Sequence, residues 1–114
     1  MKTQKLIVLI LVAMFPMVLL AHAPKKVNLK YNKEKGTLSV DAIHPVKDVN
    51  DHYVITLEIK VNGEDLETLE YTSQTSPESQ EKEIKLPDLK PGDEVSVKAT
   101  CNKFGSKTGS ITIK

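Results

Sequence analysis

The sequence predicts an all-β fold, an immunoglobulin-like antiparallel β-sandwich of about seven strands preceded by a signal peptide. Short segments of alternating apolar and polar residues recur along the chain, which is the pattern of half-buried strands. Turn residues such as Gly, Pro, Asn and Asp separate these segments, and no window has the 3.6-residue period of an amphipathic helix. These three observations favour two packed sheets over any helical architecture.

The first 21 residues have the composition of a secretory signal peptide. Residues 1–5 carry two lysines and no acidic residue, and residues 6–20 are apolar apart from Pro16. This run is shorter than the roughly 20 residues of a membrane-spanning helix, although an uncleaved anchor is the other interpretation. We expect cleavage after Ala21, with Ala23 as the alternative. Residues 22–114 would then form one periplasmic or extracellular domain without a membrane anchor.

The alternation of apolar residues places the first strands. Residues 27–31 and 38–42 alternate, with a polar turn between them. The next strand covers residues 53–61, and Asn62-Gly63 after it is a strong signal for a two-residue β-hairpin. We expect one face of this third strand to carry the apolar residues Tyr53, Ile55, Leu57, Ile59 and Val61. Residues 66–72 form the returning strand.

The second half of the domain has the same pattern. Residues 73–80 are polar and include Pro77, which indicates a loop. Ile84 and Leu86 mark the next strand, and the alternating residues of 95–101 mark the sixth. Ile111 and Ile113 close the chain as the seventh strand.

Charge and cysteine content narrow the classes of function. Removing Lys2 and Lys5 from the 16 basic residues leaves 14, against 15 acidic residues, so the exported domain is nearly neutral. No basic surplus exists and the chain contains no Trp, so a nucleic acid is not an expected partner. A single cysteine cannot form an internal disulfide, which leaves a free thiol, a metal ligand or a buried small side chain.

Histidine and cysteine are scarce, and all of them fall near strand ends or in loops. His44 precedes a proline at the end of the second strand, and His52 stands at the start of the third. The loop between them can bring the two imidazoles together at one rim, although both could equally be exposed loop residues. Cys101 continues an alternating strand, which fits a core residue, but a glycine-containing loop follows at once, which fits a ligand.

In their order along the chain, these motifs resemble those of the iron-binding domain of desulfoferrodoxin and superoxide reductase. The resemblance covers nearly all of the chain from residue 22 onward and includes the Asn62-Gly63 hairpin. The motifs that carry it are His22-Ala23-Pro24, His44-Pro45, His52-Tyr53 and Cys101-Asn102-Lys103-Phe104-Gly105.

This resemblance implies a fold, a cofactor and a reaction. The fold would be an immunoglobulin-like sandwich holding one non-haem iron, with histidines in a plane and a cysteine thiolate on the axis. His22, His44 and His52 would be equatorial ligands, and Cys101 the axial ligand. The partners would be superoxide, which the ferrous iron reduces to hydrogen peroxide, and an electron-donor protein.

The sequence departs from the family pattern at two places. Phe104 stands where the family has its fourth histidine, and Leu20-Ala21 stand where it has a glutamate and a lysine before the first histidine. If His22 is the first mature residue, its free amine and imidazole can chelate a metal together, which would suit copper. A non-catalytic iron or copper carrier is therefore an alternative, as is a metal-free immunoglobulin-like module for protein contacts.

Overall fold

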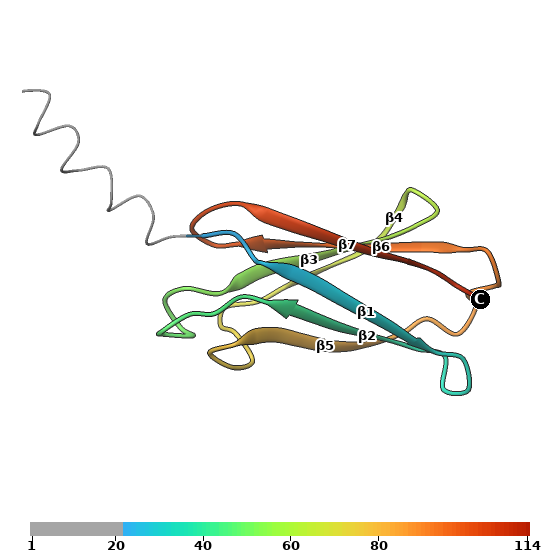
Figure 1. The fold of residues 1–114 in the computed structure, drawn as a ribbon, viewed down its shortest axis with the longest axis horizontal. Helices are drawn as coiled ribbons and strands as arrows, with labels where there is room; N and C mark the ends of the chain where they lie inside the picture. Colours follow the sequence, from blue (N-terminus) through green and yellow to red (C-terminus); the bar gives the residue numbers. More distant parts are fainter. Residues whose placement is uncertain (1–21) are drawn as a thin grey trace, which may run out of the picture.

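The computed structural model describes residues 22–114, and these residues form seven strands in two packed sheets (Figure 1). The predicted signal peptide falls on residues 1–21 and lies outside the described residues. None of the described residues belongs to a helix that is long and apolar enough to span a bilayer. The strands are β1 (Lys26–Asn32), β2 (Thr37–Ile43), β3 (Val54–Val61), β4 (Glu64–Glu70), β5 (Ser79–Lys85), β6 (Glu94–Cys101) and β7 (Ser106–Thr112).

The strand order confirms the predicted immunoglobulin-like sandwich. One sheet has the order β1-β2-β5 and the other the order β4-β3-β6-β7, and every pairing is antiparallel. The chain passes from one sheet to the other between β2 and β3, between β4 and β5, and between β5 and β6. As a result the β2–β3, β4–β5 and β6–β7 connections all lie at the same end of the molecule (Figure 1).

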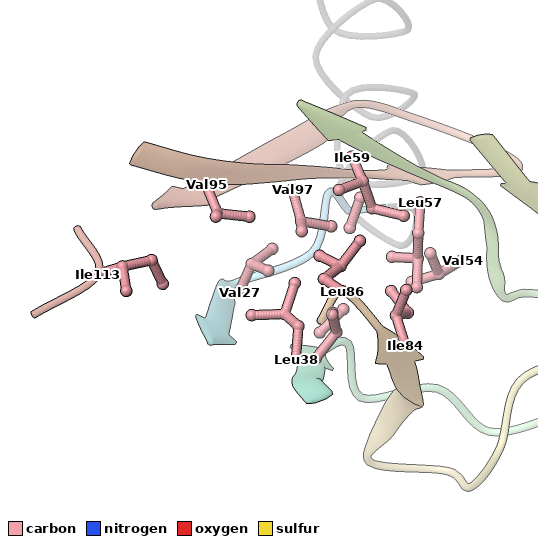
Figure 2. Packing of buried hydrophobic residues seen from close by; sticks show 13 residues of the cluster. Val27, Leu38, Val54, Leu57, Ile59, Ile84, Leu86, Val95, Val97 and Ile113 are labelled. Carbon is pink, nitrogen blue, oxygen red and sulfur yellow. The ribbon is translucent and has the colours of Figure 1, made fainter. Parts of the chain in front are cut away.

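The core lies between the two sheets and consists almost entirely of aliphatic side chains (Figure 2). It forms because alternate residues of β2, β3 and β6 face inward, as their period-2 pattern predicts. Burial of this apolar surface is the main source of the domain's stability. The cluster comprises Val27, Leu38, Val40, Ala42, Val54, Leu57, Ile59, Ile84, Leu86, Val95, Val97, Ala99 and Ile113.

The predicted hairpin between β3 and β4 is confirmed. Asn62 has a φ of 53° and Gly63 a φ of 82°, so both central residues of the turn are in the left-handed region. This is the geometry of a type I′ turn, whose twist matches that of the two strands, and Asn-Gly is the pair that adopts it most readily.

The prediction that one face of β3 runs without interruption from Tyr53 to Val61 is wrong, because the strand contains a β-bulge. Val54 lies opposite Cys101 of β6 and Thr56 lies opposite Thr100, so Ile55 is an extra residue in the ladder. The extra residue reverses the side-chain parity at the start of the strand. Val54, rather than Tyr53 or Ile55, is therefore the fully buried residue there.

Candidate metal centre

Three of the predicted ligands meet at the end of the sandwich where the connections gather. His44 follows β2 directly, His52 lies in the β2–β3 connection, and Cys101 is the last residue of β6. The possible ligand atoms of these three side chains all lie within 4.8 Å of one another. The sandwich topology produces this convergence, because it carries the end of β2, the start of β3 and the end of β6 to one rim. The cluster can hold a metal ion.

The His44 ring is completely buried and has a polar atom at each nitrogen. Its Nδ1 atom lies 2.9 Å from the side-chain Oε1 of Gln74, in the β4–β5 connection. Its Nε2 atom lies 3.1 Å from the backbone carbonyl of His22. Both partners are acceptor oxygens, so a neutral ring donates to one of them at a time, and burial between them restricts its orientation.

His52 is partly exposed and has a lowered pKa. The first cause is desolvation of the ring by burial, which opposes its charging. Positive charge on His44 and His22 adds to this effect, as does the ammonium group of Lys103, whereas Asp51 acts in the opposite direction. A lower pKa keeps the imidazole neutral over a wider pH range, and neutral imidazole is the form that binds metals.

The sulfur of Cys101 has polar neighbours, although the residue is buried. His52 Nε2 lies 3.2 Å away, and the backbone N–H of Lys103 donates to the sulfur at 3.3 Å. Cys101 does not belong to the apolar core cluster of the described residues, although it continues the inward-facing row of β6. Because the sulfur faces an imidazole and a backbone N–H rather than aliphatic side chains, this environment suits a ligand better than a simple packing residue.

The loop after Cys101 is fastened to the segment that carries His52. Asn102 accepts a hydrogen bond from the backbone N–H of Tyr53 at 3.0 Å and donates one to the backbone carbonyl of Asp51 at 3.0 Å. Lys103 adds an ion pair with the Asp51 carboxylate at 2.9 Å. These contacts set the distance between the thiol and the imidazole, so both groups are positioned before any metal binds.

His22 lies beside this group of three but not inside it. Its ring centroid is 5.1 Å from that of His44 and 5.4 Å from that of His52. His22 is not a member of the group whose possible ligand atoms lie within 4.8 Å of one another. The Nδ1 atom of His22 instead lies 3.1 Å from the backbone carbonyl of Ala23. His22 is therefore a neighbour of the group rather than one of its members.

The N-terminal segment has a defined path over the site. The backbone N–H of Lys25 donates to the carbonyl of Ile43 at 2.8 Å, and Pro24 is buried. Ala23 packs against Gly105 so closely that a Cβ atom at residue 105 would lie 2.7 Å from the Ala23 Cβ. This close packing explains why a glycine, rather than any larger residue, follows Phe104.

Phe104 contributes no ligand, and its side chain is 61% exposed. The structure brings two further residues to the site, to which the sequence motifs assigned no role. Gln74 contacts His44, and Asn102 joins the two connections. Nothing in the polar loop around Gln74 marked it out, because its role depends on a contact 30 positions away in the chain.

Comparison with known proteins found no match among family models, curated proteins or solved structures. The functional proposal therefore rests on the geometry of the site.

Proposed function

We propose that this chain is an exported mononuclear metal protein of the superoxide-reductase type, in which His22, His44, His52 and Cys101 hold a non-haem iron. The observation that carries the proposal is the convergence of three donor side chains, two from the β2–β3 connection and one from the end of β6, to within 4.8 Å of one another. The basic and apolar composition of residues 1–21 supports export.

The chemistry of the donors supports a transition metal. Imidazole and thiolate together suit iron, copper and zinc rather than magnesium or calcium. The lowered pKa of His52 favours the neutral imidazole, which is the form that binds metals. Bound ferrous iron would supply one electron to superoxide, which with two protons leaves as hydrogen peroxide.

The surroundings of the site suit a small anionic substrate. Phe104 offers no donor atom, which leaves a metal position open to an incoming molecule. The ammonium group of Lys103 lies close enough to His52 to lower its pKa, and it is 41% exposed. A positive charge there would attract superoxide, although its pairing with Asp51 weakens the effect.

A copper or iron carrier is the second candidate, and the position of His22 favours it. If cleavage occurs after Ala21, the amine and the imidazole of His22 would both stand beside the other two imidazoles. A site richer in nitrogen donors prefers copper on affinity alone. Such a protein would bind the metal and leave superoxide unchanged.

The decisive experiment measures metal content and intact mass on the protein purified from its native exported compartment. Stoichiometric iron that is lost in Cys101→Ser, with superoxide consumption by the wild-type protein, is the expected result. Lys107→Ala is the matched control, because Lys107 is exposed on β7 and outside the cluster. Stoichiometric copper in a chain that begins at His22 would establish the carrier instead. The absence of any bound metal would contradict both functions and leave the module for protein contacts.

A further inference from the structure

We infer that Gln74 is a positioning residue of this centre: its side-chain oxygen holds the ring proton of His44 on Nδ1 and so leaves Nε2 as the metal-binding atom. This inference rests on the proposed metal-binding function, and it explains how one ligand is prepared before a metal arrives. Partners that hold the second nitrogen of a ligating histidine commonly determine both its tautomer and its orientation.

The orientation of the Gln74 amide follows from its backbone partners. The side chain is 4% exposed, and its NH₂ group donates to the carbonyls of His44 at 2.7 Å and Ser76 at 2.9 Å. Its Oε1 atom accepts the N–H of Val54 at 3.1 Å. These three backbone groups have fixed donor and acceptor roles, so a rotated amide would lose all three hydrogen bonds. The atom that faces the His44 ring is therefore the oxygen.

The position of the ring proton follows from that orientation. The Gln74 oxygen can only accept, so its 2.9 Å contact is a hydrogen bond when Nδ1 of His44 carries the proton. The carbonyl of His22, 3.1 Å from Nε2, is the competing acceptor. It belongs to the N-terminal segment, whereas the Gln74 oxygen is held in the interior by three further hydrogen bonds. In neutral His44 the Nε2 lone pair is therefore free, and a metal would replace the His22 carbonyl there.

The chain contains a matched control for this role. Gln80 is also buried, and its NH₂ group donates to the carbonyls of Val54 at 3.1 Å and Ser73 at 2.8 Å. Its oxygen accepts the N–H of Thr75 at 2.9 Å. Gln74 thus binds the backbone N–H of Val54 and Gln80 binds its carbonyl, but of the two glutamines only Gln74 contacts a histidine. Loss of Gln80 removes comparable structural hydrogen bonds and leaves the His44 contact in place.

The test uses the full mature chain and Zn²⁺ as the probe metal, with affinity measured by competition against a chelator. We expect Gln74→Met to weaken Zn²⁺ binding about 10- to 100-fold, the usual effect of removing a partner of a ligating histidine. Gln80→Met should bind Zn²⁺ as the wild-type protein does.

Nitrogen-15 NMR of the metal-free protein at pH 8.5 supplies a readout that a purely structural role would not change. His44 should carry its proton on Nδ1 in the wild-type protein and in Gln80→Met, and on Nε2 in Gln74→Met. A wild-type ring with its proton on Nε2, or equal losses of affinity in Gln74→Met and Gln80→Met, would overturn the inference. The wild-type spectrum alone tests which nitrogen of His44 carries the proton, even if Gln74→Met fails to fold. A wild-type protein that binds no Zn²⁺ would instead remove the metal-binding function itself.

Discussion

The Nε2 atom of His52 lies 3.2 Å from the Sγ atom of Cys101, although 49 positions separate the two residues in the chain. The contact joins the β2–β3 connection to the end of β6. An imidazole and a thiol at this distance also form a weak hydrogen bond in the absence of metal. Metal binding to this pair should therefore stabilise the folded state.

Metal binding should stabilise the fold through this pair. A ligand that binds only the folded state at a free concentration 100 times its Kd raises the free energy of unfolding by about 2.7 kcal/mol. We expect a gain of that size for the wild-type domain with Zn²⁺, and a much smaller one for Cys101→Ser at the same Zn²⁺ concentration. Urea unfolding with and without the metal measures both gains. An equal gain in Cys101→Ser would show that Zn²⁺ binds elsewhere.

The stability of the metal-free domain should depend on the protonation of His52. The folded-state pKa of His52 lies below its ordinary value of 6.5, so folding favours the neutral ring. The contribution of this residue to stability is therefore present above pH 6.5 and is lost as the pH falls through the lower, folded-state pKa. We expect the urea midpoint to drop between pH 7.5 and pH 5, and to drop less in His52→Gln. A drop of the same size in both proteins would assign the pH dependence to other groups.

Gly105 should be intolerant of any side chain for two separable reasons. Its φ of 75° costs a non-glycine residue roughly 1–2 kcal/mol, and a Cβ atom would also collide with Ala23. Gly92 is the matched control, because its φ of 92° is similarly unfavourable but no atom lies within 4 Å of the added Cβ. Gly105→Ala should therefore lower the free energy of unfolding more than Gly92→Ala does.

The collision with Ala23 should also disturb the metal site, because Ala23 adjoins His22. We expect Gly105→Ala, but not Gly92→Ala, to weaken metal binding, as measured by competition with a chelator. Equal effects of the two substitutions on stability and on affinity would mean that the contact with Ala23 has no influence on the site.

Two tyrosine hydroxyls should respond differently to removal. Tyr31 donates a hydrogen bond to the carbonyl of Leu86 at 2.6 Å, whereas the hydroxyl of Tyr71 is buried with no partner among the described residues. Tyr31→Phe should cost about 1 kcal/mol of unfolding free energy, and Tyr71→Phe should leave it unchanged or raise it. Thermal unfolding of the two variants checks this. A larger loss of unfolding free energy in Tyr71→Phe than in Tyr31→Phe would contradict the finding that only the Tyr31 hydroxyl has a hydrogen-bond partner.

Local patterns in the sequence predicted much of the fold. Alternation of apolar residues is a property of each strand alone, and it located β1, β2, β3 and β6 of the described domain to within a few residues. It marked only the last residues of β5 and β7, and the predicted loop included Ser79 and Gln80 of β5. The Asn62-Gly63 hairpin is equally local, because two adjacent residues with positive φ define the turn. The proximity of His44 and His52, with ring centroids 4.7 Å apart, also followed from the short loop between them.

The parts that the sequence did not predict depend on contacts between distant residues. The bulge at Ile55 follows Val54, whose backbone N–H and carbonyl bind the side-chain amides of Gln74 and Gln80, and no pattern within β3 reveals these contacts. For Cys101 the strand pattern left core residue and ligand equally open.

The sequence by itself thus determined the strands, their turns and the identity of the candidate ligands. Only the tertiary structure decided which side chains meet, because antiparallel pairing and the packing of two sheets set distances across the chain. It placed the sulfur of Cys101 beside His52, left His22 at the edge of the group, and added Gln74 behind His44.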